Sequence, residues 1–491
     1  MVKIVYNYMT NKDSNFITKF SGFNLGFAPL AHLDSLTEIG NSGNASVMTN
    51  VDLLSKPGSI LQGPGLATLT AGTQAGAVSD QINFIIDKAV VNNQTYGVSD
   101  TLLHRITPTA VINTGIFPHT ITDATEGSSC IHFQGKLYYF YNKSSGADCG
   151  MYDLSTTFDD NYMSAVPTGK ASLQKAPHPV AKKEDIMLFG NGRYVGTFIS
   201  STTTLAPTKL DFGADTEVAD VCFHANQWWI AVNGSSLTGS NRTSSQVYLY
   251  DGSAVSTLLS DEVAVGVQKI GFIYPVNGIV YIAYQDTGGS NVIGYIAGRQ
   301  VKPLRFFSGD LPDFSQKTLY KNTIAFVSSG LIYSVGAVVE QLPLQISQLA
   351  DGGFETCGAL SAPFGTPLIA STESTSFKLA KFSGLDVNCT FKSLVVPTIS
   401  SDVVGMIDKI VVMTNVLKAN ASCLLKIESN QGVTSTTIGT IATTGKTRHS
   451  FSVPVNNIED YRLFLDWSGG NATNGVEIKS VYVKGHFKEI K

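Results

Sequence analysis

The most constraining feature of this 491-residue chain is a short phrase that recurs six times between residues 130 and 372. Each copy is a turn residue followed at once by an apolar, aromatic-rich run. The copies are Gly135–Tyr141, Gly192–Phe198, Gln227–Val232, Gly278–Tyr284, Asn322–Val327 and, most degraded, Gly365–Ala370. Successive copies begin 57, 35, 51, 44 and 43 residues apart. A period of roughly 40 to 50 residues is typical of one four-stranded blade of a β-propeller, so we expect radially repeated sheets.

A second phrase follows several copies of the first and ends in tyrosine, often with Asp or Gly beyond it. Its copies are Cys149–Asp153, Gln246–Gly252, Asn291–Tyr295 and Ser329–Tyr333. Short runs of β-branched, aliphatic and aromatic residues are typical of half-buried strands, and the Gly, Ser, Asn and Thr clusters between the phrases predict hairpin loops. One further atypical unit, around Gln81–Ile86 and Asn93–Gly97, brings the expectation to six or seven blades. We expect distant sequence to close the ring at that irregular first unit.

The composition is that of an all-β chain with a large core. Hydrophobic residues make up 43% and charged residues only 15%, and Gly, with 46 copies, is abundant alongside Ser, Thr and Asn. The net charge of −4 and the lack of a long basic run argue against tight binding to duplex nucleic acid. The first twelve residues lack the pattern of a secretory signal, and no run of 18 or more apolar residues follows. We therefore expect a soluble protein that is made in a cytoplasm and has no membrane anchor.

Three regions are expected along the chain. Residues 1–78 show isolated apolar residues and little periodicity, which predicts an extended N-terminal arm with one short helix near Ala31–Glu38. The arm is too apolar for the alternative, a solvated disordered tail, so it should lie across the propeller or reach a neighbouring subunit. Residues 79–385 hold the repeats and are the expected propeller. From residue 386 the phrase stops, and about seven longer strand-like runs predict a C-terminal antiparallel β-sandwich over residues 386–491.

Contiguous catalytic motifs are missing: the sequence holds no nucleophile elbow, complete phosphate-binding loop, zinc-protease pair or calcium loop. We therefore predict no enzyme activity and no catalytic, cofactor-binding or metal-binding residues. A propeller glycosidase would disperse its carboxylates over several blades, and the candidates for that alternative are Asp159, Asp160, Asp211, Asp215 and Asp251. These lie in predicted loops, where Asp also stabilises turns.

Aromatic residues provide another alternative, a sugar-stacking surface built from Trp228, Trp229, Trp467, Tyr138 and Tyr139. Adjacent residues on a strand face opposite sides, so one ring of the Trp228–Trp229 pair should be core and the other should face a neighbouring blade or solvent. Packing between blades is the structural interpretation of this pair. The eight histidines are spread singly, which is typical of structural residues, and the six cysteines without close pairing predict buried free thiols.

The segment Asn50–Leu66 precedes the repeats and combines Asn-x-Asp with a Lys-Pro-Gly turn and a Gly-Pro-Gly turn. Pro57 fixes φ and Gly58 can supply a positive φ, so the chain is delivered at a set angle into the first blade. This segment resembles the one that introduces the propeller in virion proteins of tailed bacteriophages, particularly those that form tail nozzle, hub or collar rings. Gln62 stands where that family usually has Arg.

The resemblance implies a structural component of a virion, a multi-copy ring protein of the phage tail that acts by assembly. Its partners would be copies of itself and other phage tail or portal-adaptor proteins. Double-stranded DNA would pass transiently, without specific binding, through a neutral or acidic lumen. The protein would be synthesised in the host cytoplasm and end in the virion. The alternatives are a carbohydrate- or receptor-binding virion module and, third, a glycan-degrading propeller enzyme.

Overall fold

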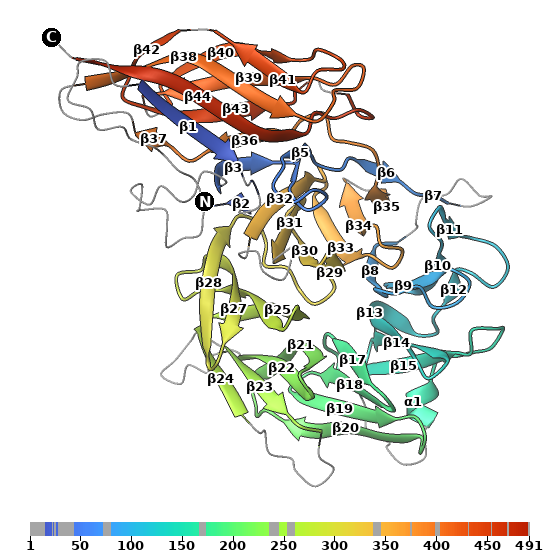
Figure 1. The fold of residues 1–491 in the computed structure, drawn as a ribbon. Helices are drawn as coiled ribbons and strands as arrows, with labels where there is room; N and C mark the ends of the chain where they lie inside the picture. Colours follow the sequence, from blue (N-terminus) through green and yellow to red (C-terminus); the bar gives the residue numbers. More distant parts are fainter. Residues whose placement is uncertain are drawn as a thin grey trace.

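The structure is a computed structural model that describes residues 15–489 apart from positions 22, 24–25, 28–43, 72–79, 166–172, 235–244, 253–260, 337–344, 374–375, 398–402, 431, 453 and 469–470. The described residues are nearly all in strands and turns, with one short helix, α1 (Tyr162–Ala165). No helix in this part of the chain is long and apolar enough to cross a membrane. Figure 1 shows sheets arranged around a common centre, with a second domain at one edge of the ring. The predicted all-β fold is confirmed, and the ring is a β-propeller.

In each sheet of the ring the strands that follow one another in the chain pair antiparallel, from an inner strand near the centre to an outer strand (Figure 1). The first sheet contains β8 (Ile82–Ile85), β9 (Thr95–Ser99), β10 (Leu102–Ile106) and β11 (Ala110–Ile112), with β12 (His119–Thr120) beside β10. The second contains β13 (Ala124–Phe133), β14 (Lys136–Lys143), β15 (Ala147–Tyr152) and β16 (Phe158–Asp159). The third contains β17 (Val180–Lys183), β18 (Ile186–Asn191), β19 (Tyr194–Ile199) and β20 (Thr204–Asp211). The next two are β21 (Thr216–His224), β22 (Gln227–Gly234), β23 (Ser245–Tyr250) and β24 (Asp261–Val267); and β25 (Lys269–Val276), β26 (Ile279–Gln285), β27 (Asn291–Ala297) and β28 (Gln300–Phe307). The chain then forms β29 (Lys317–Tyr320), β30 (Thr323–Ser328), β31 (Leu331–Gly336) and β32 (Gln345–Asp351), followed by β33 (Thr356–Ser361), β34 (Leu368–Glu373) and β35 (Ser376–Phe382).

The recurring phrase coincides with the second strand of a sheet in five of its six copies, namely β14, β22, β26, β30 and β34. The exception is Gly192–Phe198, which falls on β19, the third strand of its sheet. The second strand there is β18, which follows a turn at Glu184 and Asp185. This misplaced copy explains the uneven spacings of 57 and 35 residues, because the phrase was assigned to β19, the strand after the second strand of its sheet.

The turn before the second strand requires backbone that few residues adopt. Asn277 and Gly278 have φ values of 51° and 80°, and Lys321 and Asn322 have values of 47° and 62°. Consecutive positive φ values are characteristic of the two-residue hairpin turns whose twist matches that of the flanking strands. The Gly or Asn that opens several copies of the phrase is therefore explained by the hairpin.

Ring closure uses a strand from distant sequence, but in the last sheet rather than in the first unit as expected. The strand β6 (Leu66–Thr68) pairs antiparallel with β35 and completes the sheet of β33, β34 and β35. The adjacent β7 (Thr70–Ala71) adds a parallel strand to β11 of the first sheet. A segment that precedes the repeats thus joins the two ends of the ring.

The propeller core lies between neighbouring sheets. One cluster joins Tyr138 and Phe140 of β14 to Met187 and Phe189 of β18, and the rings of Phe140 and Phe189 have centroids 5.1 Å apart. Aromatic pairs at this separation contribute about 0.5–1.5 kcal/mol beyond their buried area. The aromatic residues of the recurring phrase therefore hold adjacent sheets together.

The second domain consists of two sheets that share one core cluster. One sheet contains β1 (Asn15–Ser21), β44 (Ile478–Glu489), β38 (Val403–Thr414), β41 (Arg448–Phe451) and β42 (Val455–Ile458). The other contains β2 (Gly26–Phe27), β3 (Asn44–Thr49), β36 (Thr390–Ser393), β43 (Asp460–Asp466), β39 (Cys423–Ser429), β40 (Thr434–Ile441) and β37 (Val396–Pro397). This second sheet continues into the propeller, because β2 also pairs parallel with β32.

The described part of residues 1–78 differs from the expected extended arm. The strand β1 pairs along its whole length with β44, and β3 pairs with β36. Phe16, Phe20, Phe23 and Met48 are buried in the core of the second domain. Their apolar character serves this intramolecular core, and the second domain therefore includes N-terminal strands as well as residues from 386 onward. The helix expected near Ala31–Glu38 lies outside the described residues.

Candidate functional site

The inner strands of the ring surround an axial cavity of about 490 Å³. Its lining includes one residue from each inner strand in turn: Phe84, Ile131, Ala181, Val221, Tyr274, Lys317 and Leu360. Most of these side chains are apolar, so the few charged groups that line the cavity are the candidates for a functional role. Concave sites near a fold axis with a few converging polar groups are common ligand sites, which makes the channel the candidate functional site.

A buried ion pair joins three inner strands across the channel. The Lys317 ammonium on β29 donates to the Asp220 carboxylate on β21 and, over 2.7 Å, to the carbonyl of Ile273 on β25. The Ile273 N–H in turn donates to Asp220 Oδ2 over 2.8 Å. Burial raises the pKa of Asp220 above its ordinary value, while Lys317 and the backbone donors oppose that rise. Since both side chains are almost inaccessible, the pair links strands rather than presenting a charge to a ligand.

Asp87 is a second carboxylate on the channel wall. It accepts a 2.8 Å hydrogen bond from Thr318 Oγ1 and a longer one of 3.4 Å from the Tyr274 hydroxyl. Burial raises the pKa of Asp87, and it raises the pKa of Tyr274 well above its ordinary range. These contacts connect the segment after β8 to β25 and β29, so the network spans sheets that lie apart in the sequence.

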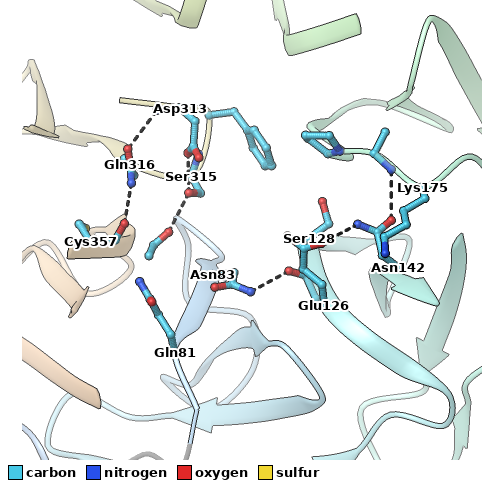
Figure 2. Close-up of a pocket in the computed structure, with 15 residues that line it drawn as sticks. Gln81, Asn83, Glu126, Ser128, Asn142, Lys175, Asp313, Ser315, Gln316 and Cys357 are labelled. Carbon is cyan, nitrogen blue, oxygen red and sulfur yellow. Dashed lines mark hydrogen bonds between the residues drawn. The ribbon is translucent and has the colours of Figure 1, made fainter. Parts of the chain in front are cut away.

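A separate polar cavity of about 450 Å³ lies beside the channel (Figure 2). Phe314 and Ser315 line both cavities, which places the two next to each other along the axis. Figure 2 shows Gln81 and Asn83 between two groups of polar side chains, one around Asp313 and Gln316 and the other around Glu126, Ser128 and Asn142. We refer to this as the mouth cavity.

The mouth cavity is held in shape by hydrogen bonds among its own walls. Asp313 Oδ1 accepts from the Ser315 N–H at 2.8 Å and from its hydroxyl at 2.6 Å. On the opposite wall, Asn142 Nδ2 donates over 3.1 Å to Glu126 Oε2. These fixed groups leave one oxygen of each carboxylate free, because no hydrogen bond among the described residues engages Asp313 Oδ2 or Glu126 Oε1.

The carboxylates considered for a glycosidase do not converge on the channel. Asp160 accepts hydrogen bonds from His119, Tyr139 and Thr122, and these donors hold the pKa of Asp160 below its ordinary value although burial opposes them. Asp211 pairs with Arg193 on the exposed side of β20. The other three candidates, Asp159, Asp215 and Asp251, do not line the axial or mouth cavity either.

The aromatic stacking candidates are nearly all internal. Trp228, Trp467, Tyr138 and Tyr139 are at most 2% exposed. Only Trp229 is partly accessible; it packs against the neighbouring sheet, and its Nε1–H donates to the His224 carbonyl at 3.3 Å. The expectation that the two tryptophan rings pack on opposite sides of their strand is confirmed.

The sequence did not single out the residues that line the channel. Asp220 lies in the apolar run from Val218 to Cys222, and Lys317 begins β29. A charged residue within the apolar run of an inner strand could have pointed to these residues, because its side chain cannot reach the solvent outside the ring. The described residues contain no group of three or more His, Cys, Asp or Glu side chains placed to hold a metal ion.

The segment Asn50–Leu66 forms the junction between the two domains and contains β4 (Val51–Asp52) and β5 (Leu61–Gln62). Asn50 Nδ2 donates to Asp386 Oδ2 at 2.9 Å. Asp52 accepts from the N–H groups of Leu54 and Ser55 and forms an ion pair of 3.4 Å with Lys321 in the propeller. The Asn-x-Asp element thus contacts the second domain through Asn50 and the propeller through Asp52.

The junction also depends on glycines, as the sequence predicted for Gly58. Gly58 has a φ of +88°, which confirms the positive φ. A Cβ at Gly63 would lie 2.4 Å from the Leu349 carbonyl oxygen and 2.5 Å from that of Asn50. Since both neighbours are backbone atoms, a side chain at position 63 would push the junction segment away from β32 and from Asn50.

Comparisons with known proteins give structural neighbours but no family. No protein-family model matches the chain, and no curated protein matches it either. The WD40 β-propeller domain of Doa1 aligns with a TM-score of 0.43 and 10% identity over 65% of this chain and 96% of its own. The Neurospora crassa Pan2 WD40 domain gives 0.43 and 8% over 66% and 96%. An exo-β-1,3-galactanase from Phanerochaete chrysosporium gives 0.32 and 9% over 87% and 100%.

Proposed function

We propose that this chain is an architectural subunit that acts by assembly, as a multi-copy ring component of the tail of a tailed bacteriophage. In this proposal a seven-bladed β-propeller and a C-terminal β-sandwich form one stiff body without enzyme activity. The observation that carries the proposal is the path of the N-terminal segment. Its strands belong to the second domain at β1 and β3, to the junction at β4 and β5, and to the last propeller sheet at β6.

The main-chain hydrogen bonds of this path make relative movement of the two domains costly. The sheet that begins at β29 runs through β32, β2 and β3 to β40, so it crosses from one domain into the other. At the junction, Ile60 and Ile478 exchange two backbone hydrogen bonds of 2.9 Å, and Leu54 is buried among propeller residues. A subunit that transmits force between neighbours needs this kind of rigidity, whereas a hinged enzyme or a flexible receptor module does not.

The resemblance of Asn50–Leu66 to the segment that introduces phage tail propellers supplies the biological setting. Copies of the chain would stand side by side around the tail axis, in contact with other tail or portal-adaptor proteins. Double-stranded DNA would pass through the ring of subunits transiently, and the net charge of −4 suits passage without retention. The protein would be made in the host cytoplasm and located in the virion.

A carbohydrate- or receptor-binding virion module is the second candidate function. The burial of Trp228, Trp467, Tyr138 and Tyr139 removes support from the stacking surface first considered for it. A glycan-degrading enzyme is third, since the carboxylates first considered for it stabilise turns and strand contacts.

The test is the oligomeric state of the full chain, measured by light scattering after size-exclusion chromatography and by negative-stain imaging. The proposal predicts closed rings of many copies whose proportion rises with protein concentration. A folded monomer at every concentration would contradict it. Glycan-array binding by a preparation that forms no rings would instead favour the second candidate, and release of reducing sugar from surface glycans would favour the third.

A further inference from the structure

The mouth cavity has the size of a small-molecule site. Its volume of about 450 Å³ falls in the range of roughly 300–1,000 Å³ that ligand pockets occupy. Its walls come from β8, β13, β33, the segment before β29 and the segment around Lys175, so several sheets contribute to one site. Because these walls belong to the rigid ring, the polar groups are already in place before a ligand arrives.

Hydrogen-bonding capacity remains on both sides of the mouth cavity. Asp313 Oδ2 and Glu126 Oε1 are acceptors that no described residue engages. Gln81 Oε1 accepts from Thr372 at 3.1 Å, while its Nε2 lies beside Gly358 and is used in no hydrogen bond among the described residues. Lys175 adds an ammonium donor to the lining. The site therefore offers acceptors and donors together.

The balance of charges narrows the ligand class. Two carboxyl groups, Asp313 and Glu126, line the mouth cavity with one ammonium, and their unengaged oxygens disfavour a phosphate or another strongly anionic ligand. Burial raises the pKa of Asp313, and Lys317 and Lys269 oppose that rise from outside the cavity lining. An apolar ligand would leave these polar groups without partners. Hydroxyl groups both donate and accept, so a polyhydroxylated ligand satisfies the acidic oxygens and the Gln81 amide at once.

An aromatic ring completes the chemistry of the mouth cavity. Phe314 lines the cavity and is partly exposed there, with its ring backed by Phe84 at a centroid distance of 5.9 Å. A fixed aromatic face of this kind packs against the apolar C–H face of a sugar ring, while the hydroxyls at the rim of that ring meet the polar walls. We propose that the mouth cavity of the propeller binds a neutral saccharide unit.

This inference does not depend on the architectural proposal, since ring assembly and saccharide binding are measured separately. The test uses saturation-transfer difference NMR and isothermal titration calorimetry on the full chain. The probes are glucose, galactose, mannose, N-acetylglucosamine and cellobiose. At least one of them should bind, with ring C–H protons receiving the strongest saturation because they contact Phe314.

Two variants remove different contacts of the mouth cavity. Asp313→Asn keeps the oxygen that accepts from Ser315 but removes the charge, and Gln81→Ala removes the amide donor. Each should weaken binding roughly tenfold or more, as expected for loss of a charged or desolvated hydrogen bond. Asp211→Asn is the matched control on the exposed side of β20, and it should leave affinity unchanged.

Thermal unfolding of each variant shows whether the ring is intact. Unchanged affinity in both cavity variants, or no binding of any probe to the unaltered chain, would overturn the inference. Binding of a phosphorylated sugar in place of the neutral probes would overturn it as well, because it would require a cationic site.

Discussion

The sharpest prediction concerns the ion pair between Lys317 and Asp220 at the centre of the ring. Lys317→Met removes the ammonium while preserving much of the side-chain length. The Asp220 carboxylate then remains buried, with only the backbone N–H groups of Ile273 and Val221 as donors. Removing one partner of a buried pair costs about 3–5 kcal/mol, since the remaining charge stays desolvated. We expect a loss of this size in the free energy of unfolding of the propeller at pH 7.

The pH dependence separates a desolvated charge from a simple packing defect. Burial already raises the pKa of Asp220, and loss of Lys317 removes one of the groups that oppose this rise. A carboxyl whose pKa is higher in the folded than in the unfolded state binds a proton on folding, so its destabilising effect disappears as pH falls. The difference in unfolding free energy between Lys317→Met and the unaltered chain should therefore shrink towards acid pH. A cavity or clash would give a constant difference.

Urea unfolding followed by tryptophan fluorescence measures this effect. Trp228 and Trp229 lie on β22, next to the strand that carries Asp220, and a Trp467→Phe background removes the signal of the second domain. This background matters because a two-domain chain need not unfold in one step. The double variant with Asp220→Asn and Lys317→Met removes the buried charge and keeps an acceptor for one of the two backbone donors, so it should be more stable than Lys317→Met alone.

The control is Lys378→Met, which breaks an ion pair with Glu373 whose side chains are 40% and 49% exposed. Exposed pairs contribute about 0–1 kcal/mol, so this variant should be nearly neutral. The reasoning is refuted if Lys317→Met costs no more than the control, or if its cost stays the same between neutral and acid pH.

Three further predictions test other parts of the molecule. Gly63→Ala should destabilise the junction by about 1–3 kcal/mol or more and speed its proteolytic cleavage, whereas Gly58→Ala should cost about 1 kcal/mol because the space around its Cβ is open. Equal cleavage rates for the two variants would contradict the role given to the close backbone contacts of Gly63. His104 and His178 are buried and their pKa values are lowered to about 4, so the folded state should lose roughly 3 kcal/mol of stability for each residue as pH falls from 6.5 to about 4. Urea midpoints measured across this pH range should show the decline, and His178→Gln should make it smaller, whereas constant midpoints for the unaltered chain would contradict the prediction. Deletion of residues 1–49 should unfold the second domain while the β22 fluorescence persists, because it removes β1 and β3 from the core; native emission from Trp467 in the truncated chain would be the opposing result.

Much of the propeller was predictable from the sequence because it depends on local rules. Hairpin turns need residues that accept positive φ, and strands between sheets need large apolar side chains, so both recur with the repeat. The same local rules misplaced one unit, since Gly192–Phe198 has the composition of a second strand but occupies the third. Local composition identifies a strand well but does not identify its position within a sheet.

The role of the N-terminal strands was not predictable in the same way. Phe16 and Phe20 lie in a short run whose partner, β44, is more than 450 residues further along the chain. Pairing at this separation leaves no periodic trace in the sequence, so an apolar segment without repeats looked like an arm. The carboxylates of the two cavities were missed for a related reason, because Asp87 and Asp220 reach the channel, and Asp313 reaches the mouth cavity, only when the ring closes.

The amino-acid sequence alone predicted the antiparallel strands, the propeller formed by the repeats and the positive φ of Gly58 at the junction. These properties follow from turn geometry and side-chain patterning within a few residues. The folded chain was needed to show which strand closes the ring, which sheets the N-terminal residues join, and which polar groups meet near the axis. Those outcomes depend on long-range backbone pairing and on burial, and neither is fixed until distant parts of the chain pack together.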